Sequence, residues 1–178
     1  MTAAARATVA DAAYHAAIRR PHAVGALHLL LGLVHSPDSI GGSVLSDSLV
    51  SDVTVWSAID YWELPSGSKF ASPRLLAVRR GPKWRPSSRT VVSSAMRVAG
   101  ERGSDRIDTG DLLIALVTMP NSRAAKVLSR NQLGIDEIAR RVGEARGTID
   151  EGPGDAPIPD LSLHRPVPWQ EGADKRPS

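Results

Sequence analysis

The stretch G-A-L-H-L-L-L-G-L-V, residues 25–34, is the most apolar part of the chain, and its pattern occurs twice. Residues 108–117 have the sequence D-T-G-D-L-L-I-A-L-V. Aligning His28 with Asp111 sets an offset of 83 residues (111 − 28), and further small and apolar residues match at that offset. The pairs are Gly32 with Ala115, Val44-Leu45 with Val127-Leu128, Val9 with Val92, Ala12 with Ala95 and Ala16 with Ala99. A fixed offset kept over most of a segment indicates a duplicated structural unit.

The composition favours helices. Hydrophobic residues make up 42% of the 178 residues, but aromatic residues only 4%. A core of Ala, Val, Leu and Ile favours an all-α fold over a β-sandwich. The chain has no cysteine, which excludes a disulfide scaffold, a thiolate metal site and a cysteine nucleophile. Its 22 basic residues are nearly balanced by 19 acidic ones, so the charge does not indicate a nucleic-acid-binding protein.

The N-terminus lacks the basic and apolar regions of a secretory signal. The longest apolar run, near residues 23–34, is shorter than the ~20 residues that a bilayer-spanning helix needs. We therefore expect a cytoplasmic protein with no membrane partner.

Proline, glycine and serine clusters divide the chain. We expect a first repeat over about 2–63, a linker over 64–83 and a second repeat over about 84–146. Helix periodicity and capping residues predict four helices in each repeat. The expected helices are 2–19, 25–36, 43–50 and 53–62, followed by 88–101, 110–118, 123–129 and 135–146. From residue 147 proline, glycine and aspartate dominate, which predicts a disordered tail to residue 178.

Four histidines raise the question of a metal site. His28 and His35 share one helix face, but a zinc site needs further ligands at characteristic spacings. His15 lies on the preceding helix and His22 in a turn, so the sequence places no such ligand beside them. We expect structural histidines, no metal and no cofactor.

Nothing in the sequence matches a nucleotide-binding or hydrolase motif. The phosphate loop of ATPases, the dinucleotide glycine motif, the G-x-S-x-G elbow and the H-E-x-x-H zinc motif are all missing. Acidic residues are scattered rather than paired across an apolar cleft. This pattern favours a binding module over an enzyme.

The two repeats resemble the Clp N-terminal domain, which precedes the ATPase rings of Clp unfoldases. Each repeat has A-x-x-x-A before a glycine turn, then H-L-L-L-G-L-V or D-L-L-I-A-L-V, and then V-L, and the resemblance covers about residues 2–142. It implies an all-α fold of two pseudo-symmetric four-helix repeats that form one compact domain. It also implies recognition of protein substrates, degrons or adaptors for the Clp protease.

The resemblance implies two ligand sites. In C-type Clp proteins the apolar helix begins G-T-E-H, and its glutamate engages the head group of phosphorylated arginine. Here Leu27 replaces that glutamate, and Gly110 stands at the same place in the second repeat, although Thr109 is retained. A guanidinium would lack its charge-assisted partner in both sites. We predict that phosphoarginine recognition is weakened or lost.

A second family surface, between the first helices of the two repeats, receives peptides and certain cyclic-peptide antibiotics. The matching positions are Arg6, Val9 and Ala10 on the first helix, with Trp84, Arg89 and Val92 around the fifth. An exposed aromatic beside aliphatic residues and arginines suits peptide binding. Alternatively, Trp84 only covers the junction with the linker.

We expect a non-catalytic protein- or peptide-binding module without ATPase modules. Its expected partners are a peptide or protein client, Clp ATPase or protease subunits, or a cyclic-peptide antibiotic. The alternative is a Clp-like scaffold recruited as a small-molecule binder or enzyme in a biosynthetic or resistance pathway. Its pocket would draw on Trp56, Trp62, His28 or Asp111. A third hypothesis, nucleic-acid binding through Arg79, Arg80, Lys83 and Arg85, has the least support.

Overall fold

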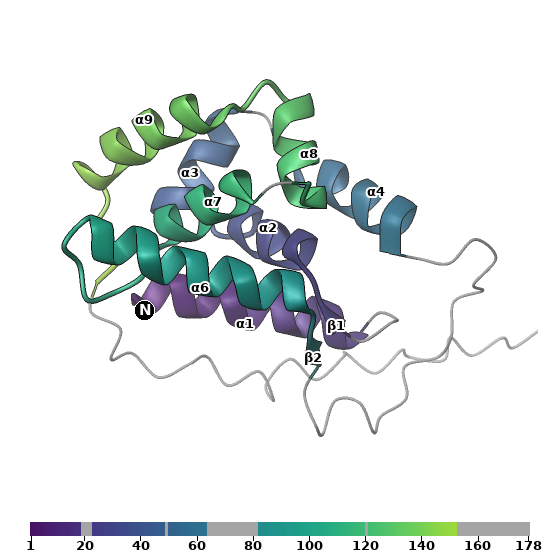
Figure 1. Cartoon of the computed structure of the whole chain (residues 1–178). Coiled ribbons are helices and arrows are strands. Elements are labelled where there is room, and N and C mark those ends of the chain that lie inside the picture. The colour runs from purple at the N-terminus through teal and green to yellow at the C-terminus, as the bar shows by residue number, and fades with distance from the viewer. Residues whose placement is uncertain (19–22, 49, 64–81, 120, 153–178) are drawn as a thin grey trace, which may run out of the picture.

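The computed structural model describes residues 1–18, 23–48, 50–63, 82–119 and 121–152 (Figure 1). Within these ranges it has eight helices and one pair of two-residue strands. The first half contains α1 (Ala3–Ile18), β1 (Ala23–Val24), α2 (Ala26–Val34), α3 (Ile40–Asp47) and α4 (Asp52–Glu63). The second contains β2 (Lys83–Trp84), α6 (Pro86–Glu101), α7 (Thr109–Thr118), α8 (Arg123–Arg130) and α9 (Ile135–Arg146). The predicted all-α class is confirmed.

The helix boundaries repeat at the offset of 83 residues. Shifting α1, α3 and α4 by this offset gives the bounds of α6, α8 and α9, and α2 shifted in the same way matches α7 to within one residue. The caps repeat as well. Ser39 accepts from the N–H of Gly42 at the start of α3, at 3.1 Å, and Ser122 accepts from the N–H of Ala125 at the start of α8, at 2.8 Å. The predicted duplication is therefore present in the hydrogen bonds as well as in the helix order.

His28 and Asp111, which defined the offset, have the same local role. The N–H of Gly25 donates to His28 Nδ1 at 3.3 Å, and the N–H of Asp108 donates to Asp111 Oδ2 at 3.0 Å. Each side chain reaches back from the first turn to the residue that precedes its helix, as in a capping box. Both residues are buried, and a local backbone contact accounts for each position.

Helices α2 and α7 form the centre of the fold. Figure 1 shows them between α1 and α6 on one side and the four shorter outer helices on the other. Helices α1 and α6 each pack against both α2 and α7. The outer helices pair across the repeats, α3 with α9 and α4 with α8. The central helices bury their leucines completely; these are Leu27, Leu29, Leu30, Leu31, Leu33, Leu112, Leu113 and Leu116. Neither repeat could bury its central helix alone.

The structure departs from the predicted boundaries in three places. Helix α3 begins at Ile40 and includes Gly41 and Gly42, because a Cβ on Gly41 would lie 2.6 Å from the carbonyl oxygen of Thr109. Helix α6 begins at Pro86, and the Ser88 hydroxyl donates to the carbonyl of Val24 at 2.7 Å instead of capping the helix.

At the linker end, residues 83 and 84 form β2, parallel to β1, with Val24 opposite Trp84. Residues 147–152 lie against the helices through Glu151, so the expected tail does not begin at residue 147. The remaining tail and linker predictions concern residues 153–178 and 64–81, outside the described ranges. No helix in the described ranges has the length and apolar character needed to cross a membrane.

Candidate functional site

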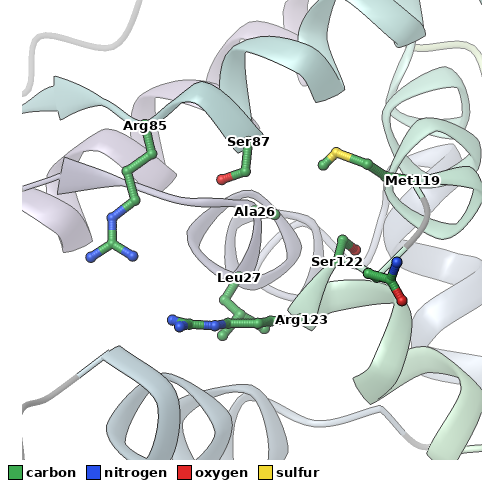
Figure 2. A pocket seen from close by; sticks show the side chains of 8 residues that line it. Ala26, Leu27, Arg85, Ser87, Met119, Ser122 and Arg123 are labelled. Atoms are coloured by element: carbon green, nitrogen blue, oxygen red, sulfur yellow. The ribbon is translucent and has the colours of Figure 1, made fainter.

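A cavity of about 280 Å³ lies where α2, α6 and α8 begin (Figure 2). Its lining residues are Ala26, Leu27, Arg85, Ser87, Met119, Asn121, Ser122 and Arg123. Figure 2 shows Arg85 entering from the start of α6 and Arg123 from the start of α8, with the first turn of α2 between them. Three helix starts thus meet at one cavity.

The charges around this cavity favour an anion. Arg85 and Arg123 each contribute a guanidinium, and the lining contains no acidic residue. Helix N-termini add partial positive charge, because their first N–H groups have no acceptor within the helix. One nitrogen of Arg123 donates to the carbonyl oxygen of Trp62 at 2.7 Å, which holds this side chain against the end of α4.

The second repeat contains the matching position, and there a carboxylate fills it. Glu151 Oε1 accepts from the N–H of Ile40 at 2.9 Å. Glu151 Oε2 accepts from the Thr2 hydroxyl at 2.8 Å and from the N–H of Thr109 at 3.1 Å. The Thr109 hydroxyl donates to the same carboxylate. Because these donors begin α1, α3 and α7, the carboxylate of Glu151 sits where three helices start.

The offset relates the two positions donor by donor. Thr2, Ile40 and Thr109 correspond to Arg85, Arg123 and Ala26, and all three counterparts line the cavity of the first repeat. The threonine hydroxyls of the filled site are therefore replaced by a guanidinium and a methyl group. The first repeat keeps the helix starts of an anion site and adds two cationic side chains.

A buried ionic network lies beside Glu151. Arg146 donates to both carboxylate oxygens of Asp108 at 2.9 Å and to Asp111 at 2.6 Å, and Arg102 donates to Asp111 at 2.7 Å. Burial alone would raise the pKa of Asp108, but the hydrogen bonds from Arg146 and from the N–H of Asp111 hold it below its ordinary value. Two ionised carboxylates at the start of α7 favour the helix dipole and hold the end of α9 in place.

The three positions of the expected phosphoarginine sites have different fates. Leu27 is buried and lines the cavity of the first repeat. Thr109 binds Glu151 and also accepts from the N–H of Gly41 at 2.8 Å. A Cβ on Gly110 would lie 2.6 Å from Val142 and 2.9 Å from Ile40, so no side chain fits there.

The expected peptide surface between the first helices of the repeats lies on α1, β2 and α6. Arg6, Val9 and Ala10 are partly buried on α1, and Val9 packs against the core. Trp84 is partly buried and packs against the core beside β1, which supports its covering role. On α6, Arg89 is exposed and Val92 is partly buried. None of these six residues lines the cavity at the helix starts.

The residues of the alternative pocket do not converge on one cavity. His28 and Asp111 are buried capping residues on different helices. Trp62 lines a separate groove between α4 and α8. Of the basic residues suggested for nucleic acid, Lys83 is exposed on β2 and Arg85 lines the cavity, whereas Arg79 and Arg80 lie outside the described residues.

The expectation that no metal-ligand residue lies near His35 is wrong. Asp11 and His15 from α1 meet His35 at the end of α2, and their ligand atoms all lie within 4.8 Å of one another. Burial alone would raise the pKa of Asp11, but the two imidazoles hold it below its ordinary value. The i, i+4 spacing of Asp11 and His15 was the signal in the sequence, because it places both on one helix face.

The sequence also concealed the role of Arg123 and Glu151. At the offset, Arg123 aligns with Ile40 and Arg85 with Thr2, so the repeats differ in charge at two helix starts. That difference was readable from the sequence. The contact of Glu151 was not, because it lies in a proline- and glycine-rich segment with no helical periodicity.

Comparison with solved structures supports the expected fold. The crystal structure of the N-terminal domain of the Clp chaperone ClpD from Arabidopsis thaliana matches with a TM-score of 0.60 and 19% identity, over 83% of this chain and 94% of that chain. A structure from preliminary investigations of a malarial protein secretion system matches with a TM-score of 0.62 and 14% identity, over 82% of this chain and 94% of that one. The fold is therefore Clp N-domain-like. No family model and no curated protein matches the sequence.

Proposed function

We propose that this protein is a non-catalytic peptide-binding module of the Clp N-domain type, and that the cavity of its first repeat captures an anionic group of a peptide. The observation that carries the proposal is the carboxylate of Glu151, which occupies the corresponding position in the second repeat. The same backbone geometry, with two added guanidinium groups, suits a carboxylate or phosphate supplied by another chain.

The lining residues support this assignment over an enzyme. They include no acid and no histidine, and the Ser122 hydroxyl already caps α8. A cavity of about 280 Å³ accommodates one side chain rather than a folded segment. Residues on either side of the bound side chain would lie on the surface. Clp ATPase or protease subunits and client proteins are the proposed partners, and co-purification with those subunits tests that part.

Binding to the cavity can be measured with a labelled peptide copied from residues 147–152 of this chain, G-T-I-D-E-G. Fluorescence polarisation with the full-length protein should detect the acidic peptide, and replacing its glutamate with glutamine should weaken binding. A phosphoserine in place of that glutamate distinguishes phosphate from carboxylate as the better anion. Hydrogen bonds to charged groups contribute about 1.5–3 kcal/mol, which corresponds to at least about tenfold in affinity.

Variants identify the site. Arg123→Ala and Arg85→Ala should each weaken binding by about tenfold or more. Arg97→Ala on α6 is the matched control, because Arg97 is exposed and pairs with Glu101 on the same helix. Equal binding of the glutamate and glutamine peptides would contradict the proposal. So would an equal loss of affinity in the Arg97 variant.

A further inference from the structure

Asp11, His15 and His35 form a cluster on the outer side of the first repeat, away from the cavity. Asp11 and His15 lie one turn apart on α1, and His35 directly follows α2. Asp11 Oδ2 lies 2.8 Å from His35 Nδ1, and Asp11 Oδ1 lies 3.4 Å from His15 Nε2. One carboxylate therefore stands between two imidazoles.

The backbone holds the two helices in fixed register at this point. Gly32 of α2 packs so closely on α1 that a Cβ there would lie 2.4 Å from the carbonyl oxygen of Thr8. The ring of His15 packs edge-on against Trp56 at 5.3 Å and against His35 at 4.9 Å between centroids. The three side chains thus approach one another from rigid elements, which is what a metal site requires.

The ring of His15 is not explained by structural hydrogen bonding. Its Nδ1 is buried and has no hydrogen-bond partner within the described part of the chain. Its Nε2 lies 3.4 Å from Asp11 Oδ1, longer than a good hydrogen bond. Ligand atoms around tetrahedral zinc stand about 3.3 Å apart, because Zn–N and Zn–O bonds are about 2.0–2.2 Å long. The spacing on this side of the cluster therefore suits a shared ion.

The internal duplication shows that the scaffold does not need these residues. At the offset of 83, Asp11, His15 and His35 correspond to Ser94, Val98 and Thr118. Helices α6 and α7 pack together as α1 and α2 do, without any ligand-type side chain at these positions. All three differences fall at one place in space, so the cluster is specific to the first repeat.

We propose that Asp11, His15 and His35 bind one divalent transition-metal ion, with Zn²⁺ as the best match. Two imidazole nitrogens and one carboxylate oxygen are ligands that zinc prefers, and three protein ligands leave a fourth position for water. The side chains of Asp11, His15 and His35 are 32%, 17% and 30% exposed, so an ion can reach them from solvent. The bound ion would link α1 to the end of α2.

The test uses the full-length protein, stripped with a chelator and titrated with Zn²⁺ by calorimetry. Co²⁺ absorption reports the ligand geometry independently. The variants carry the residues of the second repeat, Asp11→Ser, His15→Val and His35→Thr, which the same helix packing already accommodates there. We expect one ion per chain in the wild type, a loss of more than about tenfold in affinity for His35→Thr, and no binding in the triple variant.

His164→Ala is the control, because it removes a histidine that is not part of the cluster, and it should bind Zn²⁺ as the wild type does. Zn²⁺ should also raise the melting temperature of the wild type but not that of the triple variant. Circular dichroism confirms that each variant is folded. The proposal is overturned if the wild type binds no Zn²⁺, if the triple variant binds it equally well, or if the His164 variant alone loses it.

Discussion

The N–H of Arg85 donates to the carbonyl oxygen of Val24 at 2.9 Å, which joins the start of the second repeat to the second helix of the first. The opposite bond is also present, from the N–H of Thr2 to the carbonyl of Ile107 at 2.8 Å. The offset converts one bond into the other, so each repeat begins on a backbone that belongs to its partner. The two repeats are built as a reciprocal pair and share one core.

We predict that neither repeat folds alone. A fragment of residues 1–63 would expose the leucines of α2, which α6, α7 and α8 cover in the whole chain. It should show no cooperative thermal transition by circular dichroism, whereas a fragment of residues 1–152 should unfold cooperatively. Cooperative unfolding of the isolated first repeat would contradict the shared-core arrangement.

Glu151→Gln should destabilise the fold. The substitution removes the negative charge and places an amide NH₂ against groups that donate, namely the N–H groups of Ile40 and Thr109. We expect a loss of about 1.5–3 kcal/mol in the free energy of unfolding, measured with urea. The neighbouring Asp150→Asn is the control, because Asp150 is exposed and accepts only the local N–H of Gly152 among the described contacts, so its effect should be small.

Gly110→Ala should be destabilising, because its methyl group would lie 2.6 Å from Val142. Overpacking of this kind costs about 1–3 kcal/mol. Gly143→Ala on the exposed face of α9 is the matched control. A Cβ there meets nothing within 4 Å, so we expect a stabilisation of about 0.4–1 kcal/mol. Thermal melting of the two variants should move in opposite directions, and a tolerated alanine at Gly110 would show that α9 packs differently.

Acid should destabilise the protein partly through Asp108. Its pKa is lower in the folded chain than the ordinary value of 3.8, so its contribution to stability is present above that value and is lost as the pH falls toward the folded pKa. Arg146→Met removes the hydrogen bonds that lower this pKa. The variant should be less stable at pH 7, and its stability should fall less between pH 5 and 3. Parallel pH profiles of unfolding would argue against this linkage. Asp11 titrates in the same direction in both proteins and cancels in the comparison.

Phosphoarginine peptides should bind less tightly than phosphoserine peptides. Both supply a phosphate for the first-repeat cavity, but the arginine group would meet Leu27, Arg85 and Arg123 instead of an acidic partner. We expect at least about a tenfold preference for phosphoserine in competition polarisation assays, since each lost charge-assisted contact costs over 1.5 kcal/mol. Preference for phosphoarginine would show that this chain recognises the guanidinium by another route.

The sequence by itself determined the helical class, the duplication and most helix boundaries. The offset of 83 residues and the capping residues are local or periodic signals, and the helix starts followed them, as at Asp108 and Ser122. Local signals failed at Gly41 and Gly42, where glycine permits close helix packing that no short-range pattern reveals. The unfavourable helix propensity of glycine was outweighed by the contacts that its missing side chain allows.

Only the tertiary structure decided which residues meet. The carboxylate of Glu151 reaches Thr2 and Ile40 across most of the chain, and His35 reaches Asp11 across two helices. Such contacts depend on how helices cross, which one sequence does not encode at any fixed spacing. The apolar repeat fixed the scaffold because burial of leucine is periodic along a helix. The candidate sites depended on side chains from separate helix ends, whose proximity arises only when the two repeats pack together.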